Sequence, residues 1–78
     1  MARYYFQIRN NGLLEEDQEG TELASDDAAQ LEAIAGAREV VADRVKRGET
    51  IGTDAFEVVN ERGELIHTLP LRSVLKLT

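Results

Sequence analysis

Cysteine is absent from this 78-residue chain, and histidine occurs only once. Without cysteine, the chain can form no disulfide, no thiol nucleophile and no zinc site with thiolate ligands. It also lacks a run of about 18 apolar residues and an apolar signal-peptide core behind Met1, and these two absences predict a cytoplasmic protein. The hydrophobic content of 42% is that of a folded chain rather than a disordered one.

Basic residues are scarce in the first half of the chain. Residues 1–37 contain two bases and eight acids, whereas residues 38–78 contain seven of each, so the net charge of −6 arises from the first half alone. Such a domain lacks the electrostatic footprint of a protein that binds nucleic acid or an anionic membrane. Residues 1–78 form one small domain with a thin margin of stability, which dimerisation commonly remedies. The expected partner is therefore a second copy or another protein.

Residues 25–48 have the pattern of one amphipathic helix of about six turns. Ser25 or the two aspartates that follow it can cap the N-terminus, and Gly48 suits a left-handed C-cap after a basic last turn. At 100° per residue, a set of apolar side chains falls within an arc of roughly 120° and is predicted to face the core. This set is Leu31, Ile34, Ala35, Val41, Ala42 and Val45.

Arg38 lies in the middle of this predicted core arc. Its stem could lie along the sheet while its guanidinium reaches water at an edge. Alternatively, the guanidinium is partly buried and paired with a carboxylate, because an unpaired buried charge would cost several kcal/mol. The candidate partners are Asp17, Glu19 and Glu22. Either role is structural.

The first 24 residues are predicted to contain one or two strands and an acidic loop. Residues 3–9 alternate between apolar and polar side chains, as in a half-buried strand. Asn10-Asn11-Gly12 is a turn signal, after which Leu13 and Leu14 can begin a short second strand. Residues 21–24 are expected to be extended.

The acidic loop is the only stretch whose spacing resembles a metal site. Glu15, Asp17, Glu19, Gly20 and Asp26 follow the twelve-residue spacing of a calcium loop. The first position holds Glu instead of Asp, the last holds a short Asp, and no helix precedes the loop. The chain is therefore predicted to bind neither a metal nor a cofactor here, and the loop is interpreted as a solvated acidic turn.

Residues 55–71 are predicted to form a β-hairpin around Asn60-Glu61-Arg62-Gly63, which is typical of a type I turn with a glycine bulge. The predicted register places Val58 opposite Ile66, Glu57 opposite His67, and Val59 opposite Leu65. His67 is then a cross-strand partner of Glu57. No catalytic residue is predicted, because there is no thiol and the serines, Ser25 and Ser73, lie at a helix cap and in the tail.

This hairpin is predicted to have two apolar faces. One consists of Phe56, Val58 and Ile66 and is assigned to the helix, and the other consists of Val59, Leu65, Leu69 and Leu71. A single helix cannot cover both faces. The second face is covered either by the tail, residues 72–78 with Val74, Leu75 and Leu77, or by another protein chain. An uncovered apolar face of this size is an interaction site by default.

Several short motifs carry a resemblance to a known family. They are Arg3-Tyr4-Tyr5-Phe6, Asp17-x-x-Gly20-x-Glu22-Leu23, Ala37-Arg38-Glu39, Phe56-Glu57-Val58, Gly63 in the turn, and Leu69-Pro70-Leu71. Together they resemble a family of short bacterial proteins, frequent in rhizobia and related α-proteobacteria, that is known only as a domain of unknown function. The turn Asn10-Asn11-Gly12 departs from the acidic Asp-Gly turn of the family. The resemblance implies no activity, cofactor or catalytic residue, and it makes Arg38 and Asp17 a pair to test.

The sequence therefore predicts an α+β fold of the order β(β)αββ, in which a three- to four-stranded antiparallel sheet carries one long helix on one face. The expected function is that of a non-enzymatic, self-associating or protein-binding module that acts through the second sheet face or a sheet edge. An alternative is a regulatory or antitoxin-like protein that binds a basic protein, and this alternative rests on fold analogy.

Overall fold

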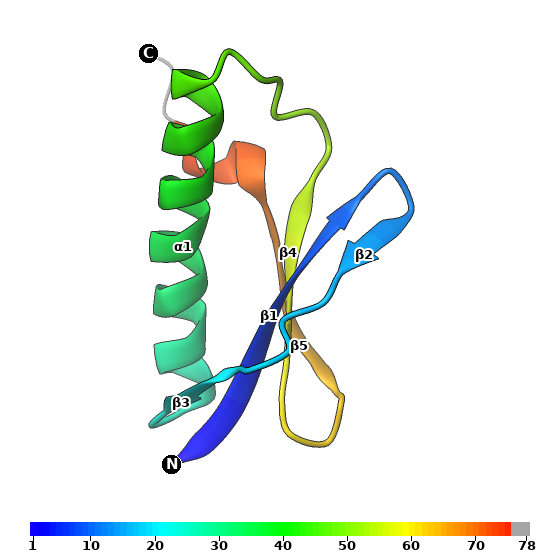
Figure 1. Cartoon of the computed structure of the whole chain (residues 1–78). Helices are drawn as coiled ribbons and strands as arrows, with labels where there is room; N and C mark the ends of the chain where they lie inside the picture. Colours follow the sequence, from blue (N-terminus) through cyan, green and yellow to red (C-terminus); the bar gives the residue numbers. More distant parts are fainter. Residues whose placement is uncertain (76–78) are drawn as a thin grey trace.

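The computed structural model describes residues 1–75 and shows an antiparallel sheet with one long helix against one of its faces (Figure 1). This arrangement confirms the predicted α+β class. The strands are β1 (Ala2–Asn10), β2 (Leu13–Glu15), β3 (Thr21–Leu23), β4 (Ala55–Val59) and β5 (Leu65–Pro70). The helix α1 spans Asp26–Lys46, and a short 3₁₀ helix, η1, spans Leu71–Val74.

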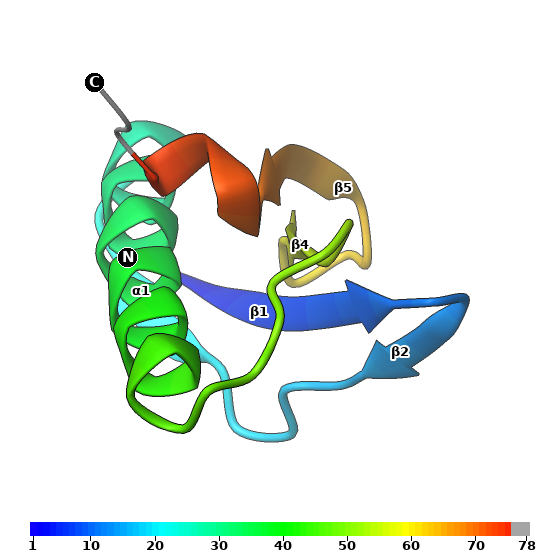
Figure 2. The ribbon, with the colours of Figure 1, turned by 90° about the horizontal axis from the view of Figure 1, so that it is seen from above.

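The sheet has five strands rather than the predicted three or four. Its order is β2-β1-β4-β5, and β3 also pairs with β1. The long strand β1 pairs with β3 through residues 2–4 and with β2 through residues 8–10, so two short strands share the edge opposite β4. Figure 2 shows that the β2 end of this sheet projects away from α1. The additional strand is β3, which lies in the stretch predicted to be extended, residues 21–24.

Helix α1 begins and ends where its capping residues predict. The Ser25 hydroxyl oxygen accepts a hydrogen bond from the backbone N–H of Ala28 at 3.1 Å. At the other end Gly48 is left-handed, with φ of 73°. Its N–H donates to the carbonyl of Val45, and the N–H of Glu49 donates to that of Arg44, which is the Schellman arrangement. Local sequence therefore specifies both ends of the helix.

The face that α1 turns toward the sheet differs from the predicted one. The buried helix residues are Ala29, Ala33, Ala37 and Val41, and of these only Val41 belongs to the predicted core arc. The sheet and η1 supply the large side chains, which include Tyr4, Phe56 and Leu71. Small helix residues let the two layers approach closely, and a Cβ on Gly36 would lie only 3.5 Å from the Phe56 ring. The predicted core arc is therefore wrong except for Val41, because the alanine side of the helix approaches the sheet most closely.

The register of the β4–β5 hairpin also differs from the prediction. The turn has the expected form, since the N–H of Gly63 donates to Asn60 O and Gly63 has a φ of 78°. Val59 pairs with Leu65 as predicted, but a bulge follows, so that Val58 pairs with His67 and Glu57 with Thr68. The bulge takes up Ile66 as an extra residue and shifts every later residue of β5 by one position.

This shift decides which leucines enter the core. Leu69 is opposite Phe56 in the sheet and packs against both hydrophobic core clusters. Leu71 opens η1 and is completely buried beside Ala37 and Val41. Val74 and Leu75 pack against the same cluster, while Leu77, the third apolar residue of the predicted tail, lies outside the described residues. The described part of the tail, up to Leu75, thus packs on the helix side of the sheet and not on the second face.

Candidate functional site

The predicted pair of Arg38 and Asp17 is not formed. Arg38 is exposed on α1 and makes no ion pair with any described residue. The arginine that holds the acidic segment is Arg3, which is paired with Glu22 at 3.1 Å and donates to the carbonyl of Glu19 at 2.6 Å. Because Arg38 lies on the outer side of the helix, neither of the two roles weighed for it against the sheet applies.

Asp17 instead organises the connection between β2 and β3. Its carboxylate accepts backbone hydrogen bonds from Phe6 at 3.2 Å, Glu19 at 3.2 Å and Gly20 at 3.1 Å. The backbone N–H of Phe6 lies between the residues of β1 that pair with β3 and those that pair with β2, so it has no strand partner on that edge. The hydrogen bond to Asp17 satisfies this N–H group. The carboxylate therefore replaces a missing strand partner.

Asp17 makes the stability of the fold depend on pH. Its partial burial acts to raise the pKa of Asp17, but the three N–H donors and the nearby Arg3 outweigh burial and leave the pKa below its ordinary value. A depressed pKa stabilises the fold above the unfolded-state value of about 3.9, and that stabilisation disappears as the pH falls through the lower folded-state pKa. We expect Asp17→Asn to lower the free energy of unfolding by about 1–2 kcal/mol at neutral pH.

Urea unfolding of both proteins across the acidic range measures this effect. The difference between wild type and Asp17→Asn is expected to shrink as the pH falls through the folded-state pKa of Asp17, because wild-type Asp17 then becomes neutral as well. A difference that stays constant down to about pH 2 would show that the charge of Asp17 contributes nothing.

The residues of the calcium-like spacing do not converge. Among residues 1–75, no group of three or more His, Asp or Glu side chains is placed to hold a metal ion. Asp17 is used by backbone donors, and Asp26 accepts a hydrogen bond at 2.7 Å from the buried Tyr4 hydroxyl, which raises the pKa of Tyr4. The imidazole Nε2 of His67 lies 3.1 Å from the carbonyl oxygen of Asp26, so this histidine contacts the helix N-terminus rather than Glu57. Glu57 is paired with Arg9 at 2.7 Å.

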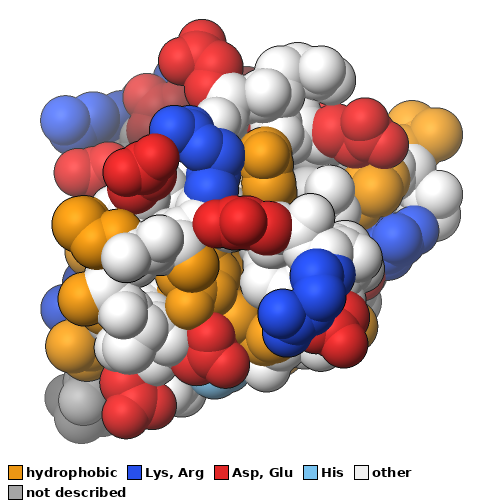
Figure 3. Space-filling view, turned by 90° about the horizontal axis from the view of Figure 1, so that it is seen from below, with side chains coloured by type: hydrophobic (Ala, Val, Ile, Leu, Met, Phe, Trp, Pro, Cys, Tyr) orange, Lys and Arg blue, Asp and Glu red, His pale blue; other side chains and the backbone are white. Residues whose placement is uncertain are grey.

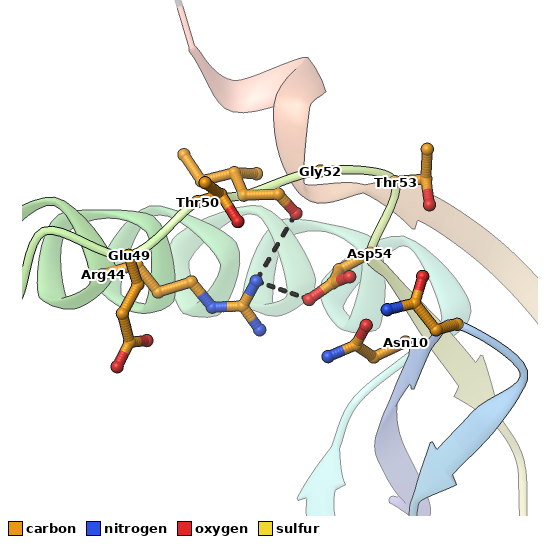
Figure 4. Close-up of a pocket in the computed structure, with 9 residues that line it drawn as sticks. Asn10, Arg44, Glu49, Thr50, Gly52, Thr53 and Asp54 are labelled. Atoms are coloured by element: carbon orange, nitrogen blue, oxygen red, sulfur yellow. Dashed lines mark hydrogen bonds and ion pairs between the residues drawn. The ribbon is translucent and has the colours of Figure 1, made fainter.

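A cavity of about 520 Å³ lies at the C-terminal end of α1 (Figure 4). Arg44 reaches from the helix across this cavity to Asp54, and the same guanidinium contacts the carbonyl of Ile51 at 3.5 Å. Asp54 is only 4% exposed. The remaining lining is mostly polar, with Ile51 as its one large apolar side chain, and it comes from residues 10–11 and the loop 49–53. Because Arg44 and Asp54 satisfy each other, this arrangement joins the helix end to β4 and leaves no buried charge for a ligand.

The predicted interaction face, Val59, Leu65, Leu69 and Leu71, is divided by the hairpin bulge. Leu71 is buried and Leu69 packs into the core on the helix side. Only Val59, which is half-buried, and Leu65, which is exposed, remain on the surface of the hairpin. Two residues beside the turn are too few for the continuous apolar face that the sequence predicted.

The most exposed apolar side chains of α1 lie on its solvent side. Leu31 is 69% exposed and Val45 is 63% exposed. With the three exposed residues between them they form a row at alternating spacings of four and three, which we call the outer helix stripe: Leu31, Ala35, Arg38, Ala42 and Val45. In Figure 3, hydrophobic side chains line the edge of the molecule on the side where Figure 1 shows α1. The sequence pattern places all five of these residues in the predicted core arc, with Arg38 in its middle, whereas the structure exposes them.

The chain was also searched for membrane-spanning helices and compared with known proteins. Among residues 1–75 there is no helix with the length and apolarity that a membrane span requires. Residues 3–72 match the sequence pattern of a family described as Domain of unknown function (DUF6894). Comparisons with curated proteins and with solved structures give no match.

Proposed function

Because the chain belongs to the family described as Domain of unknown function (DUF6894), we propose its role from its own geometry: it is a non-enzymatic protein-interaction module that binds through the outer helix stripe. This proposal keeps the class of function that the sequence predicts and moves the surface from the sheet to the helix. The observation that carries it is the exposure of Leu31 and Val45 on one side of a single helix.

Support comes first from what the core already contains. Three of the four buried helix residues are alanines and the fourth is Val41, so Leu31 and Val45 are not needed for the packing of α1 on the sheet. Leaving a leucine and a valine in water forfeits about 1.5–3 kcal/mol per side chain relative to burial. Together with the exposed Ala35 and Ala42 between them, these two residues form a row of the kind by which an amphipathic helix packs against another protein.

Support comes also from the roles of the confined polar groups. Tyr4 hydrogen-bonds to Asp26 at the start of α1, Asp17 holds three backbone N–H groups, and Asp54 is paired with Arg44. Each of these groups has a partner that belongs to the fold. A purely structural assignment therefore accounts for them without a substrate.

Photo-crosslinking tests the proposal in the cells that produce the protein. A photoreactive amino acid in place of Leu31 is expected to form adducts with protein, and the same group in place of Leu13 is not. Leu13 is a matched control because it is 74% exposed but lies on β2, away from the stripe. In solution, Leu31→Asp should abolish association while Leu13→Asp leaves it intact, and both should keep the helical circular dichroism of wild type. Absence of any protein adduct at position 31 would overturn the proposal.

The acidic segment between β2 and β3 favours a second candidate, a regulatory protein that binds a basic partner. Glu15, Glu16 and Glu19 are exposed, and none of them forms an ion pair with the described residues. A like-signed cluster on one edge steers an oppositely charged protein toward it. The same crosslinking experiment separates the two candidates, since this one places the adducts at Glu16 and not at Leu31.

A further inference from the structure

We infer that the occupant of the outer helix stripe is a second copy of this chain, docked with its α1 antiparallel and with the two-fold axis beside Arg38. The inference rests on the proposed function and adds the partner and its orientation. It follows from the distribution of charge along the exposed side of α1 and from the symmetry of the stripe about Arg38.

The exposed side of α1 has opposite charges at its two ends. The first half of the helix contains Asp26, Asp27 and Glu32 and no base. The second half contains all three bases of the helix, Arg38, Arg44 and Lys46, of which Arg44 is paired with Asp54, and two acids, Glu39 and Asp43. Glu32, Arg38, Glu39 and Lys46 are exposed, and none of them forms an ion pair with the described residues. An antiparallel second copy places the acidic half of one helix against the half of the other that contains all of its bases, and it opposes the two helix dipoles. A parallel copy would place like charges together.

The apolar residues of the stripe obey the same symmetry. Leu31 and Val45 are each seven residues from Arg38, so rotation about an axis at Arg38 brings Leu31 of one copy onto Val45 of the other. The same rotation brings Ala35 of one copy to within one residue of Ala42 of the other, because Ala35 is three residues before Arg38 and Ala42 is four residues after it. The alternating spacing of four and three residues is that of a helix pair that crosses at about 20°. Each end of the stripe is thereby covered by the only other large apolar residue of the row.

Charged residues flank this row in register with it. Glu32, Glu39 and Lys46 each follow a stripe residue directly, so they lie on one flank at intervals of seven residues. In an antiparallel pair this flank faces the same flank of the second copy. Glu32 is six residues before Arg38 and Lys46 is eight residues after it, so at both ends of the interface the two side chains are offset by two residues, about 3 Å along the helix. Around the axis, two Arg38 and two Glu39 form a neutral group of four charges. The small side chains of Ala35 and Ala42 leave room for each Arg38 to cross the axis.

The size of the stripe sets the strength of association. Fourteen residue steps from Leu31 to Val45 span about 21 Å, and one helix pair of this length lies at the lower end of specific interfaces. The dimer is therefore expected to dissociate in the micromolar range and to weaken with salt.

Disulfide trapping tests the orientation directly, because the chain has no cysteine of its own. Under mild oxidation, a mixture of Leu31→Cys and Val45→Cys proteins is expected to give a crosslinked heterodimer, because antiparallel packing brings these two positions together. Neither variant alone should crosslink, since two copies of position 31 are about 21 Å apart in this arrangement. Mixing Leu13→Cys with Val45→Cys is the matched control and should give no product. Crosslinking of Leu31→Cys with itself would overturn the antiparallel orientation.

A charge exchange tests the flanking pairs without touching the apolar contacts. Glu32→Lys and Lys46→Glu should each raise the dissociation constant of the dimer about tenfold at low salt, because each change turns two attractive pairs into repulsive ones. The double variant restores opposite charges across the interface and should recover the affinity of wild type. Within one chain the two residues are about 21 Å apart, so recovery cannot arise inside the monomer. Single variants that leave the dissociation constant unchanged would overturn this pairing.

The inference and the proposed function fail in different ways. If sedimentation finds only monomer up to about 1 mM, well above the dissociation constant expected here, the second copy is overturned. Photo-crosslinking at position 31 to a different protein would then leave the proposed function standing. If position 31 gives no protein adduct and the chain is monomeric, both fail together.

Discussion

Replacement of Gly20 by alanine is expected to lower the free energy of unfolding by about 3 kcal/mol, from backbone strain and crowding together. Gly20 has a φ of 73°, a conformation that costs an L-residue about 1–2 kcal/mol. An added Cβ would also lie 2.9 Å from Arg3 Cγ, 2.9 Å from Tyr5 Cε1 and 3.0 Å from the carbonyl oxygen of Tyr4. Because a backbone atom is among these neighbours, the strand itself would have to move.

Thermal unfolding followed by circular dichroism measures this loss, and a melting temperature lower by roughly 15 °C is expected. Gly52→Ala is the control. Gly52 also has a positive φ, of 60°, but nothing lies within 4 Å of an added Cβ, so only about 1 kcal/mol of backbone strain is expected. If the two variants lose equal stability, the close packing of the acidic segment on β1 contributes nothing.

The second large effect is expected from Asp54→Ala, which should cost about 3–4 kcal/mol. The substitution leaves the guanidinium of Arg44 largely buried without its carboxylate partner, since the side chain of Arg44 is only 14% exposed. A buried charge that loses its partner is far more costly than the pair is stabilising. For a domain of this size the loss is a large fraction of the total stability.

A double substitution distinguishes the interaction between Asp54 and Arg44 from the separate contributions of the two side chains to stability. In Asp54→Ala with Arg44→Met the unpaired charge is gone, so the double variant should be more stable than Asp54→Ala alone. Urea unfolding of the two single variants and the double variant measures the coupling. Additive losses would mean that the two side chains do not act as a pair.

The local elements were predictable from sequence because their signals are local. Ser25 and Gly48 cap the two ends of α1, and each of them bonds to backbone groups only a few residues away in the chain. The alternation in residues 3–9 predicts β1, and the turn ending at Gly63 predicts the hairpin with its glycine bulge. The short strand β3 was less evident, because three residues paired only through their backbone leave little pattern in the side chains.

For the candidate site, the sequence predicts which residues form the row but not whether that row faces the sheet or the solvent. The spacing of the sequence predicts one helical row that contains Leu31, Ala35, Ala42 and Val45, with Arg38 as a charge within it. Whether that row faces the sheet or the solvent depends on which side chains the opposing layer provides. Tyr4, Phe56 and Leu71 fill that layer, and only the alanine side of α1 can approach them closely.

The sequence by itself determined the helix, the strand β1, the hairpin of β4 and β5, the α+β class and the acidic character of the first half, because propensity, capping and charge act between near neighbours. Tertiary structure alone decided the hairpin register beyond Val59, the burial of Leu69 and Leu71, and the outward turn of Leu31 and Val45. One extra residue in a bulge reverses the faces of a strand. Likewise, the buried side of a helix with two apolar rows is chosen by the shape of the surface it meets. Neither choice is encoded in the residues of a single element.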